Sequence, residues 1–154
     1  MTPKELWERF TNEKQIDEDE YEVWSFGVDP DLLSQLVITG HKTGTSSLYI
    51  LYEIENEPLP KNNDYSVIVD SNNNAVCIIQ NIKVDIIPFN KVSTEHAYKE
   101  GEGNKSLKYW RKVHQTFFTE SLLKINMKFT CDMKVVYEEF KVVYKLWCVL
   151  MTKK

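Results

Sequence analysis

Residues 64–89, DYSVIVDSNNNAVCIIQNIKVDIIPF, contain the clearest strand pattern of the chain. The segments on either side of residues 71–74 are rich in valine and isoleucine, which favour extended structure. The four residues between them, SNNN, contain asparagines, and asparagine tolerates the left-handed conformations found in tight turns. The stretch therefore predicts two strands joined by a hairpin turn.

Three helices are predicted ahead of this hairpin. Proline near a helix start, acidic residues in the first turn and glycine after the last turn are the signals that indicate them. The first helix has Thr2 as its cap, and the third ends at Gly40. The predicted ranges are 3–14, 17–27 and 29–40.

The remaining segments give an order of helices, strands, helices and strands. Residues 46–56 fit a helix or a strand, with a helix from the first residue slightly favoured, and the prolines of residues 57–64 indicate a loop. Residues 105–125 are the longest helical candidate, and residues 134–150 predict a strand with a possible bend at 137–140. This order is typical of an α+β fold rather than a regular parallel alternation. The apolar stripe of the long helix is Leu107, Trp110, His114, Phe117 or Phe118, Leu122 and Ile125.

The composition is that of an ordinary globular protein. The 154 residues are 42% hydrophobic and 27% charged, which suits a single domain. The longest apolar run, residues 142–151, is about half a membrane span and includes Lys145, so no membrane helix is predicted. The start of the chain lacks the apolar region of a signal peptide. Three widely spaced cysteines, Cys77, Cys131 and Cys148, predict reduced thiols in a cytoplasmic protein.

The net charge of −4 is unevenly distributed along the chain. Residues 1–31 carry ten acidic and three basic side chains, whereas residues 83–154 carry fourteen basic and eight acidic ones. An acidic protein is not a general nucleic-acid binder, since such binding draws on many phosphate contacts. The basic second half could still hold one nucleotide or a short RNA, or be an ordinary charged surface.

Residues 39–48, TGHKTGTSSL, place a lysine between two glycines among hydroxyl side chains. The motif is not a phosphate-binding P-loop, because the lysine precedes the second glycine. A turn would let Lys42 and Thr45 face one cleft, where the lysine could activate the hydroxyl or hold an anion. An extended backbone would place them on opposite faces, and a helix cap followed by an exposed lysine explains the same residues.

A second polar cluster is HAYKEGEGN, residues 96–104. Glu100 and Glu102 adjoin glycines that permit the close approach of a ligand, and a glutamate near a lysine can transfer protons. A solvated loop is the alternative. His114 lies on the apolar stripe and is interpreted as a core histidine with satisfied hydrogen bonds. Arg111 could bind a phosphate or carboxylate, or pair with a surface acid.

Two aromatic residues, Trp24 and Phe26, could stack on a base or pack in the core. No group of histidines, cysteines and acidic residues has the spacing of a zinc site, so neither a metal nor a cofactor is predicted.

Several of these segments together resemble the ASCH domain family, named for activating-signal-cointegrator homology. The most specific matches are GxKTxTxS at residues 40–47 and EGEG-N-x-SLxxWRxxHxxFF at residues 100–118. The resemblance implies a PUA-like β-barrel flanked by helices. It also implies a single ASCH domain over residues 1–154, with a helical extension at 1–22 and a core at 23–151.

The resemblance also implies a function. PUA domains bind RNA, so RNA or a nucleoside-like ligand is the expected partner. One branch of the family removes the acetyl group from N4-acetylcytidine with a lysine, a threonine and a glutamate that match Lys42, Thr45 and Glu100. A non-catalytic RNA- or nucleotide-binding module and a ribonuclease are the alternatives. The expected ligand contacts are Trp24, Phe26, Gly40, Thr43, Ser47, Trp110 and Arg111.

Two positions depart from the family pattern. Ser47 stands where the amidohydrolase branch has an arginine, which leaves the substrate open. Asn104 stands where aspartate is common after EGEG, and either residue can cap a helix. The sequence predicts no oligomeric state.

Overall fold

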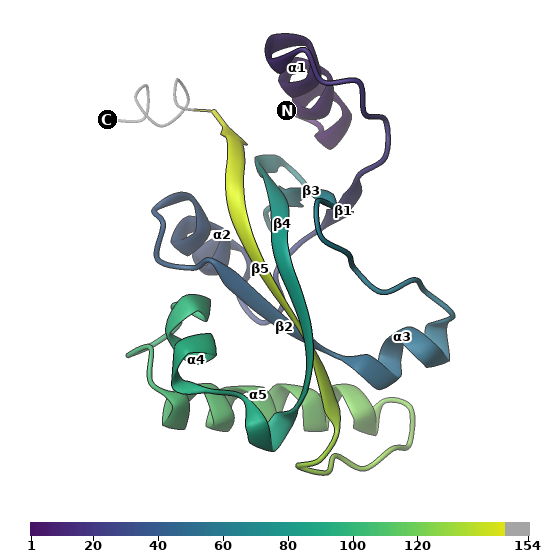
Figure 1. Cartoon of the computed structure of the whole chain (residues 1–154), viewed down its shortest axis with the longest axis vertical. Coiled ribbons are helices and arrows are strands. Elements are labelled where there is room, and N and C mark those ends of the chain that lie inside the picture. The colour runs from purple at the N-terminus through teal and green to yellow at the C-terminus, as the bar shows by residue number, and fades with distance from the viewer. Residues whose placement is uncertain (147–154) are drawn as a thin grey trace.

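The computed structural model describes residues 1–146, and within this range five strands form one curled sheet in the order β1-β3-β4-β5-β2 (Figure 1). Cys148 and the predicted end of the last strand lie outside the described residues. Helices pack on both faces of the sheet, which confirms the α+β prediction. The strands are β1 (Glu22–Trp24), β2 (Gly44–Leu48), β3 (Tyr65–Val69), β4 (Ala75–Pro88) and β5 (Lys134–Lys145). The helices are α1 (Pro3–Lys14), α2 (Pro30–Ile38), α3 (Tyr49–Glu55), α4 (Thr94–Glu100) and α5 (Leu107–Leu123), with the 3-10 turn η1 (Phe89–Lys91).

The predicted hairpin is confirmed as β3 and β4, which pair antiparallel. Asp70 accepts hydrogen bonds from the backbone N–H groups of Asn72 and Asn74, and Asn73 has a φ of 63°. These contacts are the asparagine turn chemistry that the sequence predicts. β4 continues past the hairpin and pairs along its length with β5, with a register shift around Ile82.

The predicted helix over residues 17–27 is wrong. Residues 17–21 have no regular structure, and Glu22–Trp24 form β1, which pairs in parallel with β3. Two physical effects favour the strand. A helix would place four consecutive acidic side chains, residues 17–20, in one turn, where they repel one another. The strand instead forms backbone hydrogen bonds at the edge of the sheet and leads to the buried Phe26.

The ambiguous segment at 46–56 contains both structures, so a helix from its first residue is also wrong. Residues 44–48 form β2, which pairs antiparallel with β5 and buries Leu48, and α3 begins directly afterwards. The predictions at 3–14 and 29–40 are confirmed by α1 and α2. Gly40 has a φ of +84° after α2, where glycine is the residue with least strain.

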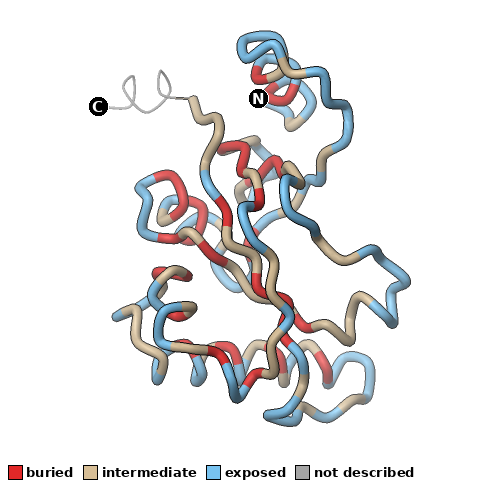
Figure 2. The backbone as a smooth tube through the Cα atoms, in the orientation of Figure 1, coloured by how far each residue is buried: buried red, intermediate tan, exposed pale blue. Residues whose placement is uncertain are grey.

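The buried side chains form clusters on both faces of the sheet. Figure 2 marks the buried residues along the backbone. Because neighbouring strand residues point to opposite faces, Val67 packs under α1 while Ile68 packs under α2. A third cluster joins α4 and α5 to β2 and β5. The α5 stripe is buried at Trp110, His114, Phe118 and Leu122, but Ile125 lies past the helix end and is exposed.

Among residues 1–146, every helix is too short or too polar to cross a lipid bilayer.

Candidate active site

Lys42 lies at the centre of a buried polar cluster. The turn after α2 positions it, since the backbone N–H groups of His41 and Lys42 both donate to the carbonyl of Leu36. Its side chain is only 1% exposed, so the alternative of a solvated surface lysine is wrong. The Nζ atom donates to the carbonyl of Gly44 and to Oε2 of Glu102, both at 2.8 Å. These contacts offset the cost of burying an ammonium group.

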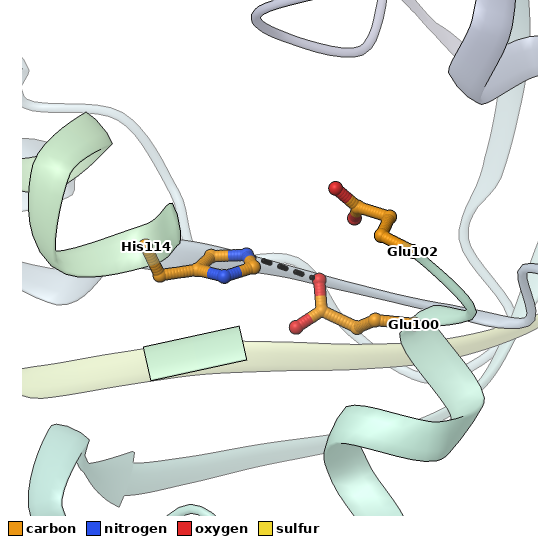
Figure 3. Close-up of side chains that lie close together, drawn as sticks. All are labelled: Glu100, Glu102 and His114. Carbon is orange, nitrogen blue, oxygen red and sulfur yellow. Dashed lines mark ion pairs between the residues drawn. The ribbon is translucent and has the colours of Figure 1, made fainter. Parts of the chain in front are cut away.

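Glu100, the last residue of α4, is equally buried at 1% exposure. Its Oε2 accepts hydrogen bonds from Ser46 Oγ at 2.8 Å and from the indole N–H of Trp110. Its Oε1 lies 3.4 Å from His114 Nε2 (Figure 3) and also 3.6 Å from Lys42 Nζ. Burial by itself raises the pKa of Glu100, but the charges of His114 and Lys42 outweigh burial and lower it to about 2.

His114 completes the cluster from α5. Its Nδ1–H donates to the carbonyl of Trp110 at 2.8 Å, and its ring stacks on that of Trp110. Nε2 therefore points to the carboxylate, an arrangement that suits the imidazolium form. Burial lowers the pKa of His114, yet the negative charge of Glu100 outweighs burial and the pKa is raised. The histidine is satisfied in the core, as the sequence predicts, and it also belongs to the site.

The cluster gathers three side chains of types that bind metals. Ligand atoms of Glu100, Glu102 and His114 lie within 4.8 Å of one another (Figure 3). Sequence spacing did not indicate this group. Lys42 already supplies a cation between the two carboxylates, and together with an imidazolium it makes the cluster electrically neutral. A divalent metal would have to displace the ammonium and a proton, so the donor set fits an ion-pair network better than a metal.

Gly101 is required for this geometry. It follows α4 with a φ of +70°, and a Cβ at this position would lie 1.9 Å from the carbonyl oxygen of His41. The close approach of Gly101 to the turn after α2 brings Glu100 and Glu102 to Lys42.

The predicted catalytic residues border one small cavity of about 50 Å³. Lys42, Thr45 and Glu100 all line it, so the structure brings these three together. It adjoins a larger cavity of about 820 Å³, and Phe26, Thr45 and Ser46 line both. A space of that size accommodates a nucleoside.

Three of the predicted ligand contacts lie at this larger cavity. Trp24 and Phe26 line it with their rings edge to face at 4.8 Å, and Lys42 Nζ lies 5.3 Å from the Phe26 ring. Phe26 also packs in the core, which confirms one interpretation of this residue, and its contact with a base stays a prediction. Ser47 lines the cavity as well, and its hydroxyl shares a 2.8 Å hydrogen bond with that of Tyr52.

The other predicted ligand contacts lie elsewhere. Gly40 and Thr43 line a separate cavity of about 520 Å³, where the Thr43 hydroxyl donates to the carbonyl of Lys99. Trp110 is buried behind Glu100 and holds its carboxylate. Arg111 is exposed on α5, and its guanidinium approaches the carbonyls of residues 90 and 92 rather than a cavity.

Two polar side chains on the wall of the larger cavity were missed by the sequence. Asn81 on β4 is 5% exposed and donates through Nδ2 to Glu138 Oε1 at 3.0 Å. Burial and the charge of Asp64 raise the pKa of Glu138, and the hydrogen bond from Asn81 opposes this, with a net rise. The sequence feature that could have indicated Glu138 is an acidic residue inside the largely apolar strand segment VVYEEF.

The larger cavity is acidic. Within the described part of the chain, its lining contains a single basic side chain, Lys61. A phosphate in this cavity would meet repulsion, whereas a neutral or cationic ligand would not. The carboxylates in the lining are Glu18, Glu20, Glu22, Glu57, Asp64 and Glu138.

Comparison with known proteins gives a family and related structures. The sequence model of the ASCH domain matches residues 22–144. Protein EF3133 of Enterococcus faecalis V583, from family DUF984, is 35% identical; the match covers 96% of this chain and 91% of that one, with a TM-score of 0.87. The ASCH domain from Lactobacillus crispatus JV V101 is 28% identical over 92% of this chain and 94% of that one, with a TM-score of 0.83. No curated protein sequence gives a significant match.

These similarities confirm the fold expected from the resemblance. The curled sheet with flanking helices is the PUA-like half-barrel of ASCH domains. A more distant structure, hypothetical protein PH0355, shares the fold at 18% identity and a TM-score of 0.53.

Proposed function

The chain belongs to the ASCH domain family, which is associated with RNA, and on this premise we propose that it hydrolyses an acylated amino group on a free nucleoside, with N4-acetylcytidine as the first candidate. One observation carries the proposal: Lys42, Thr45 and Glu100 line one small cavity that opens beside a nucleoside-sized one. Amide hydrolysis requires a nucleophile, a group that stabilises the oxyanion and a proton carrier.

Thr45 supplies the nucleophilic hydroxyl in this proposal, and the Lys42 ammonium stabilises the developing oxyanion. Glu100 was expected to transfer a proton, which in amide hydrolysis goes to the leaving amine. Its pKa of about 2 keeps it ionised at neutral pH, so in the resting site it cannot donate. Its contacts support a different role, in which it orients Lys42 and holds the local charge balance.

The electrostatics of the larger cavity favour a nucleoside over RNA. The six carboxylates in its lining would repel a phosphate backbone. The paired aromatic rings of Trp24 and Phe26 offer a surface on which an uncharged base can pack.

The test is the release of cytidine from N4-acetylcytidine, followed by chromatography. Thr45→Val keeps the shape of the side chain and removes the hydroxyl, so we expect at least a ~100-fold loss of kcat. Arg111→Ala is the matched control, because this side chain lies away from both cavities. Absence of turnover by the wild-type protein, or full activity of Thr45→Val, would exclude the proposal.

A binding module without turnover is the second candidate. The observation that favours it is that both oxygens of Glu100 are already engaged by buried partners, as expected of a fixed structural network. Titration of cytidine and of a labelled short RNA at two salt concentrations distinguishes the outcomes. Nucleoside binding without hydrolysis supports this candidate, salt-dependent RNA binding indicates phosphate contacts, and shortening of the RNA on a gel indicates a ribonuclease.

A further inference from the structure

We infer that Glu138, rather than Glu100, is the residue that exchanges protons with Thr45 and with the leaving amine. This inference rests on the proposed hydrolysis and adds a catalytic residue to it.

The register of the sheet places Thr45 and Glu138 side by side. They are directly opposite each other in the antiparallel pair of β2 and β5. Opposed residues point to the same face of a sheet, with their Cβ atoms about 4.5–5.5 Å apart. Both residues line the cavity of about 820 Å³, so a ligand there reaches both.

Glu100 contacts the opposite face of β2, through Ser46. Ser46, the neighbour of Thr45, donates its hydroxyl to Glu100. Because adjacent residues of a strand point to opposite faces, the Thr45 side chain extends to the face that carries Glu138, although Thr45 also borders the small cavity that Glu100 lines. Ser46, Trp110, His114 and Lys42 already surround that carboxylate.

The Glu138 carboxylate is oriented by one hydrogen bond and can still accept others. Asn81 donates to its Oε1, and within residues 1–146 no hydrogen bond engages Oε2. Asn81 is fixed in turn by a hydrogen bond from Nδ2 to the carbonyl of Lys61 at 3.3 Å. The net rise in the pKa of Glu138 moves this carboxyl towards the range in which proton exchange is efficient. The titratable or charged side chains that share its cavity are Glu18, Glu20, Tyr21, Glu22, Tyr52, Glu57, Lys61, Asp64 and Tyr65.

The reaction balances without a further reactant other than water. Thr45 Oγ adds to the amide carbonyl carbon, its proton passes to the Glu138 carboxylate, and the carbonyl electrons move to the oxygen. The C–N bond then breaks, and the nitrogen keeps the electron pair and takes the proton from Glu138. Water adds to the resulting threonyl ester and gives a proton to Glu138. The C–Oγ bond breaks, and that proton returns to Thr45 as the carboxylic acid leaves.

The experiment is the pH dependence of kcat for N4-acetylcytidine hydrolysis. In the wild-type protein we expect kcat to rise with pH as Glu138 loses its proton. Glu138→Gln should lower kcat by about 100-fold or more, leave KM within a few-fold and abolish this rise. Asn81→Ala removes a hydrogen bond that lowers the pKa of Glu138, so the rise should move to higher pH. Gln80→Ala, at the half-buried neighbouring position, is the matched control.

The outcomes separate this inference from the proposed function. If the wild-type protein hydrolyses the substrate while Glu138→Gln keeps its kcat and pH profile, the inference is wrong and the proposed function stands. If the wild-type protein is inactive, both fail. A carboxyl ¹³C NMR titration of the wild-type protein needs no variant to fold: titration of Glu138 above the ordinary glutamate range supports the inference, and titration at or below that range overturns it.

Discussion

His114 Nε2 lies 3.4 Å from Glu100 Oε1 inside the protein, and each group shifts the titration of the other. Burial raises the pKa of Glu100, but the neighbouring positive charges lower it from 4.5 to about 2. Burial lowers the pKa of His114, but Glu100 outweighs burial and raises it above 6.5. Because the two shifts are opposite, the stability of the fold should fall at acidic pH and also at alkaline pH.

The first prediction is that the stability contributed by the Glu100–His114 pair is greatest between pH 4.5 and pH 6.5. The contribution of Glu100 is complete above its unfolded pKa of 4.5 and is lost as the pH falls towards about 2. The contribution of His114 is complete below 6.5 and is lost as the pH rises through its folded-state value. Urea denaturation across this range measures the free energy of unfolding.

His114→Gln separates the two contributions. Removing one partner of a buried ion pair costs about 3–5 kcal/mol, and we expect that loss below pH 6.5. The decline on the alkaline side should become shallower, because the shifted imidazole is gone. His41→Gln, at an exposed position, is the control. An alkaline decline as steep in His114→Gln as in the wild-type protein would contradict the assignment.

The second prediction concerns Gly101. Gly101→Ala should destabilise the protein by more than the ~1–3 kcal/mol of a left-handed backbone, because the added Cβ meets the carbonyl oxygen of His41. Gly40→Ala is a matched control, since Gly40 also has a positive φ but a Cβ added there would meet no atom within 4 Å. The difference between the two unfolding free energies measures the clash alone. Equal effects would show that the contact between α4 and the turn after α2 is not tight.

The third prediction concerns Lys42. Lys42→Met keeps much of the side-chain volume but leaves two carboxylates near each other without their shared cation. We expect a loss of about 3–5 kcal/mol at neutral pH, measured by urea denaturation. The double variant Lys42→Met, Glu102→Gln should lose less than the sum of the single changes, because the second change removes part of the repulsion. Lys108→Met, at an exposed position of α5, should be nearly neutral.

Elements that depend on local chemistry could be predicted from the sequence. The asparagine turn between β3 and β4 and the caps of α1 and α2 depend on residues within a few positions of each other. β1 could not be predicted in this way, because its partner is β3, about forty residues later and in parallel. The acidic residues before it favour a helix start locally, and the pairing with β3 outweighs that preference.

The same distinction between local and long-range contacts decides which residues of the site could be predicted. Lys42 and Glu100 are 58 residues apart, and only the resemblance to a family joined them before the structure was known. The helical spacing of His114 predicts a core residue. Spacing alone cannot show whether a buried histidine packs only against apolar side chains or also has a carboxylate partner. Glu138 was missed because the face on which a strand residue lies depends on register, and the register of β5 is fixed by its pairing with β2 and β4.

The last prediction is that Glu138→Gln stabilises the protein at neutral pH. Burial raises the pKa of Glu138, so the folded state holds a proton more tightly than the unfolded chain. The stability from this group is complete below the unfolded pKa of 4.5 and is lost as the pH rises through the folded-state value. Glutamine keeps the hydrogen-bonding shape without the charge, so the Tm of the variant should exceed that of the wild-type protein at neutral pH and match it at low pH. Glu139→Gln, on the opposite face of β5, should instead lower the Tm, because Glu139 pairs with Lys99. A Glu138→Gln variant that is less stable at every pH would show that the carboxylate is needed in its ionised form.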